Sequence, residues 1–314
     1  MSIAVHDITL NEVKSAIKSL KGILTAGHDQ LPAFLFKDCS FQLAPFIHRF
    51  LNLIIENASF PNVWKLSKIT PIFKSGSKSE ITNYRTIALL SNFSKIFEIV
   101  INRRLHSKLE HVISDTQHGF MPGRSTNTNL IQICQYISSE IDKKRQVDVI
   151  YTNLSKAFDS ICHAQLINKL DCLGFEAQLL KLINSYLLNR SFYVICNGFS
   201  SKTYPCPSGV PQGSILGPLL FLLYINDLLL SLSCPALAYA DDKKLFSTIY
   251  DISDCLALQK SLDKINSWCK CNRFVFNVNK CKFVNFTRCH REIKFTYTID
   301  FTPLTPPKIW GNIR

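Results

Sequence analysis

The stretch Ala236-Leu237-Ala238-Tyr239-Ala240-Asp241-Asp242 places two adjacent aspartates directly after an apolar run. This pattern suits the tip of a β-hairpin, where both carboxylates can meet in one cleft. Like charges this close repel, so both stay ionised readily only when a cation lies between them. Oxygen ligands favour Mg²⁺, which typically binds one or two carboxylates together with substrate phosphates. The stretch therefore indicates a magnesium site of the kind used in nucleotidyl transfer.

Taken alone, two adjacent aspartates most often form a solvated turn, so the rest of the chain has to support the metal site. The chain has 314 residues, which is enough for one large domain or two modest ones. Its apolar fraction of 46% allows a sizeable core, and the composition is not that of a disordered protein.

The net charge of +13 is concentrated in two regions. Residues 61–110 contain nine Lys or Arg against three Glu, and residues 264–294 contain eight against one. Clustered basic charge indicates a polyanionic partner, for which nucleic acid is the main candidate. The alternative is a basic protein whose charge serves solubility alone.

The twelve cysteines show no disulfide-like spacing, and no secretory signal opens the chain. We therefore expect an intracellular protein of the nucleus or cytoplasm, with reduced thiols. The most apolar stretch, residues 215–232, is interrupted by Asn226 and Asp227, which predicts a buried helix rather than a membrane span. Cys269, Cys271 and Cys281, with the Cys289-His290 pair, invite a zinc interpretation, but their spacing matches no common zinc motif.

Hydrophobic periodicity predicts strands that alternate with helices, which places the chain in a mixed α/β or α+β class. The expected helices cover residues 8–21, 41–56, 91–109, 127–143, 162–173, 178–188, 215–230 and 254–271. The expected strands include the buried run 147–152, a hairpin tip at 74–77, and a second hairpin of 191–197 and 200–205 around Asn197-Gly198.

Four further segments occur in a fixed order before the aspartate pair. They are Ile69-Thr70-Pro71-Ile72-Phe73-Lys74-Ser75-Gly76 with Asn83-Tyr84-Arg85; Gln117-His118-Gly119-Phe120 with Arg124-Ser125-Thr126; Tyr151-Thr152-Asn153-Leu154-Ser155-Lys156-Ala157-Phe158-Asp159; and Gly209-Val210-Pro211-Gln212-Gly213-Ser214, continuing to Asn226-Asp227. Together with the aspartate hairpin they resemble the reverse transcriptases of non-LTR retrotransposons, most closely the jockey-type mobile elements. The resemblance covers about residues 20–290.

The resemblance implies an α+β right-hand polymerase with fingers and palm, in which the palm is a ferredoxin-like βαββαβ sheet. It also implies the domain limits: a helical extension at the base of the fingers (1–60), a reverse transcriptase domain (61–290) with fingers (61–145) and palm (146–290), and a tail in place of the thumb (291–314). The implied activity is RNA-directed DNA polymerase, with an RNA template, a DNA primer and deoxynucleoside triphosphates as partners, no membrane, and an oligomeric state left open.

By position in the family motifs, Asn153 and Asp241 stand where two residues hold two Mg²⁺ ions, and Asp242 is auxiliary; Mn²⁺ is an alternative ion. One metal activates the primer 3′-hydroxyl, and the other neutralises the triphosphate and the leaving pyrophosphate. Lys280 matches a palm lysine proposed to protonate pyrophosphate, with a solvated surface lysine as the alternative.

The resemblance also assigns nucleotide-binding residues. Lys74 and Arg85 match positions that grip the incoming triphosphate, and multiple donors onto phosphate suit an arginine. Phe158 matches the aromatic gate that excludes a ribose 2′-hydroxyl, with a core aromatic as the alternative. Gln212 and Gly213 match a turn that lets the backbone approach the nucleotide and template. Lys156 lies in the same motif as Phe158 and belongs to this group.

Asn153 is the main departure from the family pattern, because an aspartate is expected there. An amide oxygen coordinates Mg²⁺ without bringing negative charge, and Asp159 lies six residues further on, past a turn. Loss of a single transition-state contact lowers a rate by roughly 10²–10³. The sequence therefore predicts a kept fold with impaired catalysis.

Thr86 is a further departure, because the family has a proline after the arginine that Arg85 matches. Two more departures concern the ends of the chain: the prolines of 301–307 disfavour the helical thumb, and an endonuclease region is not expected in these 314 residues. A truncated, decayed element explains Asn153, the missing thumb and the missing endonuclease together. Two alternatives to an active enzyme stay open: a nucleic-acid-binding remnant without catalysis, and a product without selected function.

Overall fold

The computed structural model describes residues 2–22, 24–288 and 291–306. The chain divides into two compact units, each of which contains two separate stretches of sequence. Unit 1 consists of Met1–His111 and Ile161–Tyr224, and unit 2 consists of Val112–Ser160 and Ile225–Arg314.

Unit 2 is built on a four-stranded sheet in the order β7-β8-β3-β9, in which all neighbouring strands are antiparallel. These strands are β3 (Gln146–Thr152), β7 (Ala236–Tyr239), β8 (Asp242–Ile249) and β9 (Lys282–Phe286). The first and third strands along the chain lie in the middle of the sheet, which is the ferredoxin-like order expected for a polymerase palm. The β-branched run in β3 is buried between its two neighbours, as its sequence predicts.

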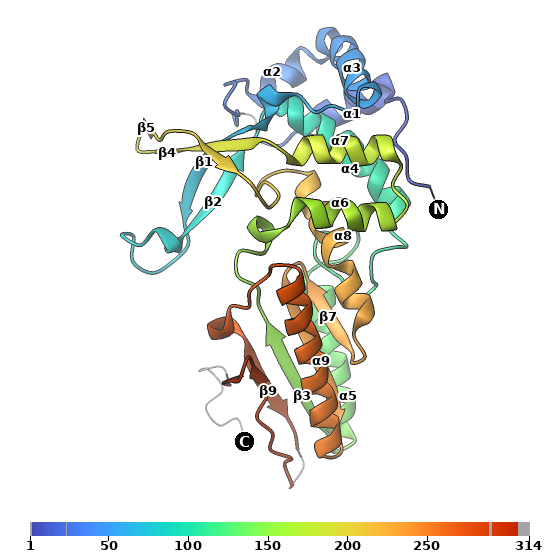
Figure 1. Cartoon of the computed structure of the whole chain (residues 1–314), viewed down its shortest axis with the longest axis vertical. Helices are drawn as coiled ribbons and strands as arrows, with labels where there is room; N and C mark the ends of the chain where they lie inside the picture. The colour runs from blue at the N-terminus through green and yellow to red at the C-terminus, as the bar shows by residue number, and fades with distance from the viewer. Residues whose placement is uncertain (1, 23, 289–290, 307–314) are drawn as a thin grey trace. The chain divides into compact units, whose positions relative to one another are not determined.

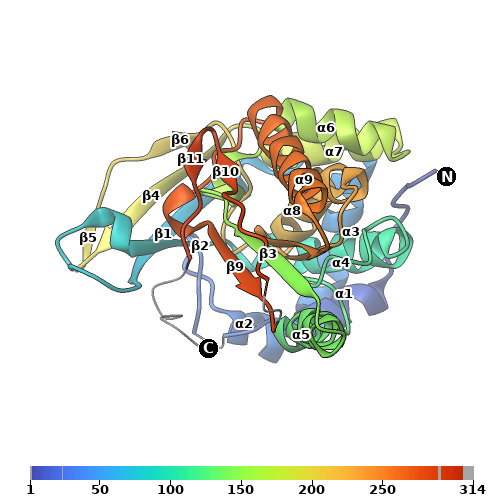
Figure 2. The same ribbon diagram turned by 90° about the horizontal axis from the view of Figure 1, so that it is seen from below.

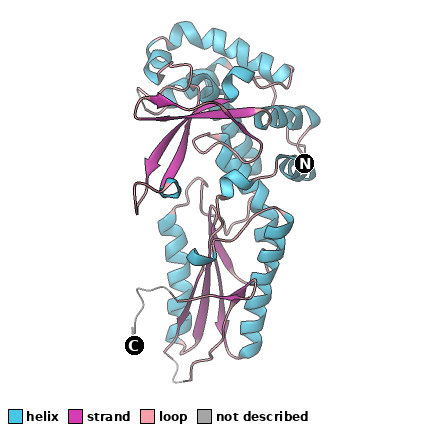
Figure 3. Cartoon of the chain, turned by 60° about the vertical axis from the view of Figure 1, so that its left-hand side comes forward, coloured by secondary structure: helices cyan, strands magenta, loops and turns pink. Residues whose placement is uncertain are grey.

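The sheet of unit 2 lies between two long helices, α5 (Thr126–Asp142) and α9 (Ile252–Cys271), as Figures 2 and 3 show. On the α5 side, a compact core consists of Ile133, Ile137, Val147, Val149, Leu237 and Phe246. Both helices begin with a capping box, at Ser125 and Asp251, which satisfies amide groups that a helix start leaves without partners. The rigid sheet therefore fixes where β3 ends and where the β7–β8 turn lies.

Unit 1 combines a twisted sheet with six helices of its own (Figure 1). Its strands are β1 (Leu66–Phe73), β2 (Tyr84–Leu89), β4 (Arg190–Cys196), β5 (Phe199–Ser200) and β6 (Tyr204–Cys206). Strand β1 pairs antiparallel with β2 and parallel with β4. The helices are α1 (Leu10–Ser19), α2 (Ala33–Asp38), α3 (Ser40–Glu56), α4 (Asn92–Leu109), α6 (His163–Cys172) and α7 (Ala177–Leu187).

The division between the two units falls within α8 (Leu216–Ser231), between Tyr224 and Ile225. In unit 1, the buried Glu98 accepts hydrogen bonds from the backbone amides of Ile215 (2.6 Å) and Leu216 (3.2 Å). A carboxylate at this position caps the helix and complements its dipole. In the described part of the chain, no helix combines the length and apolar character that crossing a bilayer requires.

The structure corrects two details of the predicted elements and confirms a third. The strand expected at 200–205 is divided into β5 and β6, and β6 returns to pair with the beginning of β4. The hairpin tip expected at 74–77 is a longer connection that contains a short 3₁₀ helix (Ile81–Asn83). The second hairpin does turn at Asn197-Gly198, where φ is +51° and +82°, as tight two-residue turns require.

The described part of the tail contains a two-stranded ribbon, β10 (Thr298–Ile299) and β11 (Thr302–Pro303). Residues 291–306 form no helix, in agreement with the proline content. Pro307 and the residues that follow it lie outside the described residues, as do Cys289 and His290.

Candidate metal centre and nucleotide-binding residues

The two aspartates lie at the turn between β7 and β8, where Tyr239 pairs with Asp242. Ala240 adopts a left-handed conformation (φ +56°), which is uncommon for a residue with a Cβ atom. This tight reversal presents Asp241 half-buried and Asp242 exposed at the end of the sheet. The hairpin predicted from the sequence is therefore present, with both carboxylates at its tip.

The buried Gln117 braces this turn from a neighbouring loop. Its Oε1 accepts hydrogen bonds from the backbone amides of Gly119 (2.8 Å) and Ala240 (2.9 Å), and its Nε2 donates to the carbonyl of Ala240 (3.4 Å). A Cβ atom on Gly119 would lie 2.3 Å from the amide nitrogen of Ala240, so only glycine permits this approach. The second motif of the sequence thus supports the aspartate turn, a role that its pattern did not indicate.

Asn153 follows the last residue of β3 and lies directly beside the aspartates. Its Nδ2 donates a hydrogen bond to Oδ1 of Asp242 at 2.7 Å. Its backbone amide points to the buried Sγ of Cys281 (3.4 Å), and its carbonyl accepts from the amide of Asn277 (2.9 Å). The backbone therefore brings together the three positions that the sequence pattern grouped.

Burial and neighbouring charges perturb the carboxyl group of Asp241. Burial raises its pKa first, and the charge of Asp242 raises it further, whereas Lys243 and Lys280 lower it. A carboxylate under these influences gains from an additional cation, because the cation offsets both the lost solvation and the repulsion. Lys280, in the short 3₁₀ helix Val278–Lys280, is exposed and contributes part of this positive field.

Lys243 was not singled out by the sequence analysis, although it follows the aspartate pair directly. Its side chain is buried, with 1% of the residue exposed, and burial lowers its pKa. Its Nζ donates to the carbonyl oxygen of Asp241 at 3.3 Å. Most lysines in proteins are exposed, and nothing in the sequence around Lys243 indicates that this one is buried.

The donor atoms at the turn are oxygens, as Mg²⁺ prefers: the carboxylates of Asp241 and Asp242 and the amide oxygen of Asn153. They fit one hard cation that also binds substrate phosphates. Among the described residues, no group of three or more His, Cys, Asp or Glu side chains is placed to hold a metal. The donor set therefore provides two negative charges where an aspartate at position 153 would make three.

The loop after β3 carries the proposed gate and its neighbour. Lys156 is exposed in a left-handed conformation (φ +47°), and Phe158 lies in the 3₁₀ helix Ala157–Ser160. The ring of Phe158 packs edge-on against that of Phe120, with centroids 5.9 Å apart. Phe158 is half-buried rather than part of a closed core.

The remaining nucleotide-binding candidates all lie in unit 1. Lys74 and Arg85 are both exposed on the β1–β2 hairpin, where the amide of Lys74 donates to the carbonyl of Asn83 at 2.9 Å and Arg85 pairs with Ile72. Gln212 and Gly213 meet the same hairpin at Ala88, whose amide donates to the carbonyl of Gln212 at 2.7 Å. Within unit 1, these four positions therefore lie on or against the β1–β2 hairpin.

Gly213 adopts a backbone conformation that favours glycine. Its φ is +124°, and an added Cβ would lie 2.4 Å from the carbonyl oxygen of Ala88. Both features exclude larger residues without a backbone shift.

Comparison with known proteins agrees with this geometry. The family model for reverse transcriptase (RNA-dependent DNA polymerase) matches residues 72–299. The chain is 32% identical over 301 residues to the probable RNA-directed DNA polymerase from transposon BS of Drosophila melanogaster, covering 91% of this chain and 32% of that protein. It is 28% identical over 298 residues to the RNA-directed DNA polymerase from mobile element jockey of the same species, again covering 91% and 32%. The chain spans about a third of the length of these relatives.

Among solved structures, apo telomerase from Candida tropicalis, truncated from the C-terminal domain, has a TM-score of 0.56 at 14% identity. The match covers 85% of this chain and 58% of that one, and it supports the polymerase fold. Because the family model matches most of the chain, the chain belongs to the reverse transcriptase family.

Proposed function

We propose that this chain is the polymerase portion of a jockey-type retrotransposon protein, built for RNA-directed DNA synthesis and impaired by Asn153. The observation that carries the proposal is the meeting of Asn153 with Asp242 at 2.7 Å, beside Asp241. Its substrates would be an RNA template, a DNA primer and deoxynucleoside triphosphates, acted on inside the cell, in the nucleus or cytoplasm. The concentration of Lys and Arg in residues 61–110 and 264–294 supports a nucleic-acid partner.

In the proposed reaction, the primer 3′-oxygen forms a bond to the α-phosphorus of the nucleotide, the bond from that phosphorus to the pyrophosphate oxygen breaks, and the 3′-hydroxyl proton is released. Asp241 and Asp242 would hold Mg²⁺ or Mn²⁺, which when bound lowers the pKa of the 3′-hydroxyl and neutralises the phosphates. Lys280 would supply a proton to the leaving pyrophosphate. Phe158 would exclude a 2′-hydroxyl from the sugar pocket.

In unit 1, Lys74 and Arg85 supply positive charge for a triphosphate, and the turn at Gln212-Gly213 lets backbone approach a ligand closely. Lys156, next to Phe158 in unit 2, adds a further exposed cation. These roles follow from the family resemblance and from the exposure of the charged side chains.

Asn153 accounts for the proposed impairment in two ways. It removes one negative charge from the metal ligands, and its amide hydrogen occupies an oxygen of Asp242 that a metal would otherwise use. Loss of one such contact lowers catalytic rates by roughly 10²–10³. The same hydrogen bond favours the second candidate function, a nucleic-acid-binding remnant without catalysis, because it gives the Asp242 carboxylate a partner in the absence of a metal.

Primer extension on a defined RNA template tests the proposal. We expect the unmodified chain to be slower than the Asn153→Asp variant by about 10² or more, in Mg²⁺ and in Mn²⁺. An Asp241→Ala exchange in the Asn153→Asp background is the matched control and should abolish synthesis. Full activity with Asn153 in place would refute the impairment, and RNA binding without synthesis in the Asn153→Asp variant would favour the remnant.

A further inference from the structure

Phe120, in the loop between α4 and α5, combines an uncommon backbone conformation with an exposed ring. Its φ of +60° lies in the left-handed region, where a bulky residue is an outlier. The residue is also 47% exposed, so burial offsets only part of the cost of that conformation. Residues held in such conformations cluster at sites that serve function. Phe120 therefore has the features of a residue that serves function rather than stability.

Phe301 shows how local geometry alone can explain a left-handed phenylalanine. Its φ is +63°, and with Asp300 (φ +46°) it forms the two-residue turn that joins β10 to β11. A hairpin turn of type I′ requires positive φ at both of these positions. Phe120 lies between two helices, so hairpin geometry does not account for its conformation.

The neighbours of Phe120 hold its backbone in place. Gly119 lies against the backbone of Ala240, and Gln117 accepts hydrogen bonds from the amides of both residues, at 2.8 and 2.9 Å. On the other side of Phe120, Met121 is buried, with 6% exposed. The loop therefore ties the position of Phe120 to the turn that carries the two aspartates.

The side chain of Phe120 contacts Phe158, the aromatic gate of the proposed function. The two rings pack edge-on, with centroids 5.9 Å apart and an interplanar angle of 82°. Edge-to-face contacts are attractive and depend on orientation, so each ring limits where the other lies. Both residues belong to unit 2, as does Ala240. One loop thus contacts the aspartate turn through its backbone and Phe158 through a side chain.

The backbone on the N-terminal side of Phe158 is anchored independently of Phe120. The amide of Ser155 donates to the carbonyl of Val275 at 2.8 Å, and Ala157 is buried, with 4% exposed. Phe120 can therefore act on the direction of the Phe158 ring more than on its backbone. That direction matters for a gate, because a misplacement of about 1 Å near a reacting group can change a rate by about 10².

We propose that Phe120 is a positioning residue that sets how strictly the chain selects deoxynucleotides over ribonucleotides. Its ring holds the Phe158 ring in the orientation that excludes a 2′-hydroxyl, and its backbone keeps that contact in register with the aspartate turn. The proposal rests on the proposed function, because it takes Phe158 as the gate. It adds to sugar selection a second residue, which acts through the first.

Single-nucleotide primer extension opposite a template cytidine measures sugar selection as the ratio of kcat/KM for dGTP to that for GTP. In the Asn153→Asp background, we expect Phe120→Ala to lower this ratio about two- to tenfold, the range of one edge-to-face ring contact. Phe120→Tyr keeps the ring and should restore the ratio. A purely structural role would lower both kcat/KM values equally, and the unchanged ratio would overturn the proposal.

A double-mutant cycle tests whether Phe120 acts through Phe158. We expect Phe158→Ala alone to lower the ratio about tenfold or more, because it opens space beside the sugar. Adding Phe120→Ala to that variant should then change the ratio no further. Losses that multiply in the double variant would contradict the proposal, since Phe120 would then act on selection without Phe158.

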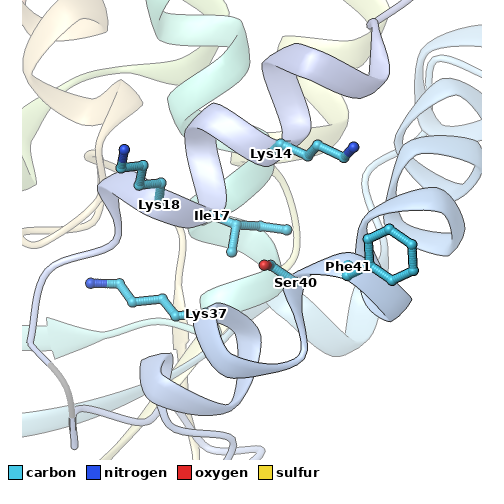
Figure 4. Close-up of a pocket in the computed structure, with 6 residues that line it drawn as sticks. All are labelled: Lys14, Ile17, Lys18, Lys37, Ser40 and Phe41. Atoms are coloured by element: carbon cyan, nitrogen blue, oxygen red, sulfur yellow. The ribbon is translucent and has the colours of Figure 1, made fainter.

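Two controls separate sugar selection from general losses of stability or affinity. Phe301→Ala removes a left-handed phenylalanine that is 98% exposed in unit 2. Lys14→Gln removes a charge from a pocket of unit 1 that Lys14, Lys18 and Lys37 line (Figure 4). Neither variant should change the ratio, because any loss that it causes affects dGTP and GTP alike.

A readout without nucleotide or metal follows the gate ring directly. With 4-fluorophenylalanine in place of Phe158, the ¹⁹F NMR spectrum of the chain should show one sharp resonance. Phe120→Ala should broaden or divide this resonance, because the ring then adopts several orientations, and Phe301→Ala should leave it unchanged. One sharp resonance in the Phe120→Ala variant would overturn the proposal, since Phe158 would then hold its orientation alone.

Circular dichroism melting verifies that each variant is folded. Phe120→Gly serves where the alanine variant is unstable, because glycine adopts the left-handed conformation readily, and it should lower the ratio as much. Synthesis by the Asn153→Asp chain with an unchanged ratio in the Phe120 variants would refute this proposal alone. If that chain makes no product with either nucleotide, the proposed function fails, and the assignment of Phe120 to sugar selection fails with it.

Discussion

The amide of Asn153 donates a hydrogen bond to Oδ1 of Asp242 across 89 positions of sequence, at a distance of 2.7 Å. An aspartate at position 153 could not make this bond, because an ionised carboxylate only accepts hydrogen bonds. Asn153 thus brings one negative charge fewer to the site and adds a hydrogen-bond donor to Asp242. Its consequence can be measured as stability as well as activity.

We expect Asn153→Asp to lower the free energy of unfolding by about 1–2 kcal/mol in a chelator, since a hydrogen bond to a charged group is replaced by repulsion between carboxylates. Millimolar Mg²⁺ should reverse this loss, because the ion binds the folded state alone. Chemical denaturation with and without Mg²⁺ measures both effects. Asn153→Ala is the control: it loses the hydrogen bond and should gain little from Mg²⁺. An equal response of all three chains to Mg²⁺ would contradict the metal assignment.

The contacts of Gln117 lead to a second prediction. Gln117→Ala leaves the amides of Gly119 and Ala240 without their acceptor inside the protein, which should lower the unfolding free energy by about 2–3 kcal/mol. The amide of Ala240 should also exchange faster with solvent, as detected by hydrogen exchange. Gln135→Ala, at an exposed glutamine of α5, should change stability by less than about 1 kcal/mol. Slow exchange at Ala240 in the Gln117 variant would show that the turn is stable without the hydrogen bonds of Gln117.

Local pattern was sufficient for most elements of the fold. The helix expected at 127–143 is Thr126–Asp142, and the strand expected at 147–152 is Gln146–Thr152, because periodicity and β-branching are properties of neighbouring residues. The grouping of Asn153 with the aspartates came from the order of motifs in a known family, and the structure brings these residues together.

Other features depend on contacts between residues far apart in sequence, which local pattern does not encode. Gln117 meets Ala240 across 123 positions, and nothing in Gln117-His118-Gly119 specifies that partner. The burial of Lys243 is equally unpredictable, because a lysine after two aspartates usually faces solvent. Each unit contains two separate stretches of sequence, and in unit 2 the pairing of β3 with β8 joins them. No change of composition at residues 111 or 161 indicates these boundaries.

Gly213 gives a third prediction, in unit 1. Gly213→Ala places a Cβ atom 2.4 Å from the carbonyl oxygen of Ala88 and a side chain at φ +124°, so we expect a loss of about 2 kcal/mol or more. Gly123→Ala is the matched control, since its φ is +71° but nothing lies within 4 Å of the added Cβ. It should lower stability by only about 1 kcal/mol. Denaturant titration separates the two, and equal losses would show that backbone conformation alone limits position 213.

The buried carboxyl of Asp148 gives a prediction that depends on pH. Asp148 is fully buried in β3 and accepts hydrogen bonds from Tyr297 Oη (2.8 Å) and Gln146 Nε2 (3.0 Å). Burial raises its pKa, while the bond from Tyr297 lowers it. A carboxyl group with a raised pKa binds its proton more tightly in the folded state than in the unfolded state. The stability of the fold therefore falls as the pH rises from the ordinary pKa of an aspartate to the raised pKa of Asp148.

Tyr297→Phe removes the donor that favours the ionised form, so the folded-state pKa of Asp148 should rise further. We expect the variant to lose about 1.5–3 kcal/mol near pH 7 and markedly less below pH ~4, where Asp148 is protonated in both states. Urea denaturation of both chains between pH ~3.5 and ~8 measures this difference. Tyr250→Phe, at a tyrosine that is 60% exposed, should show no such trend. A loss that is the same at every pH would mean that Tyr297 contributes only packing against Phe283 and Phe295 and does not act through the carboxylate.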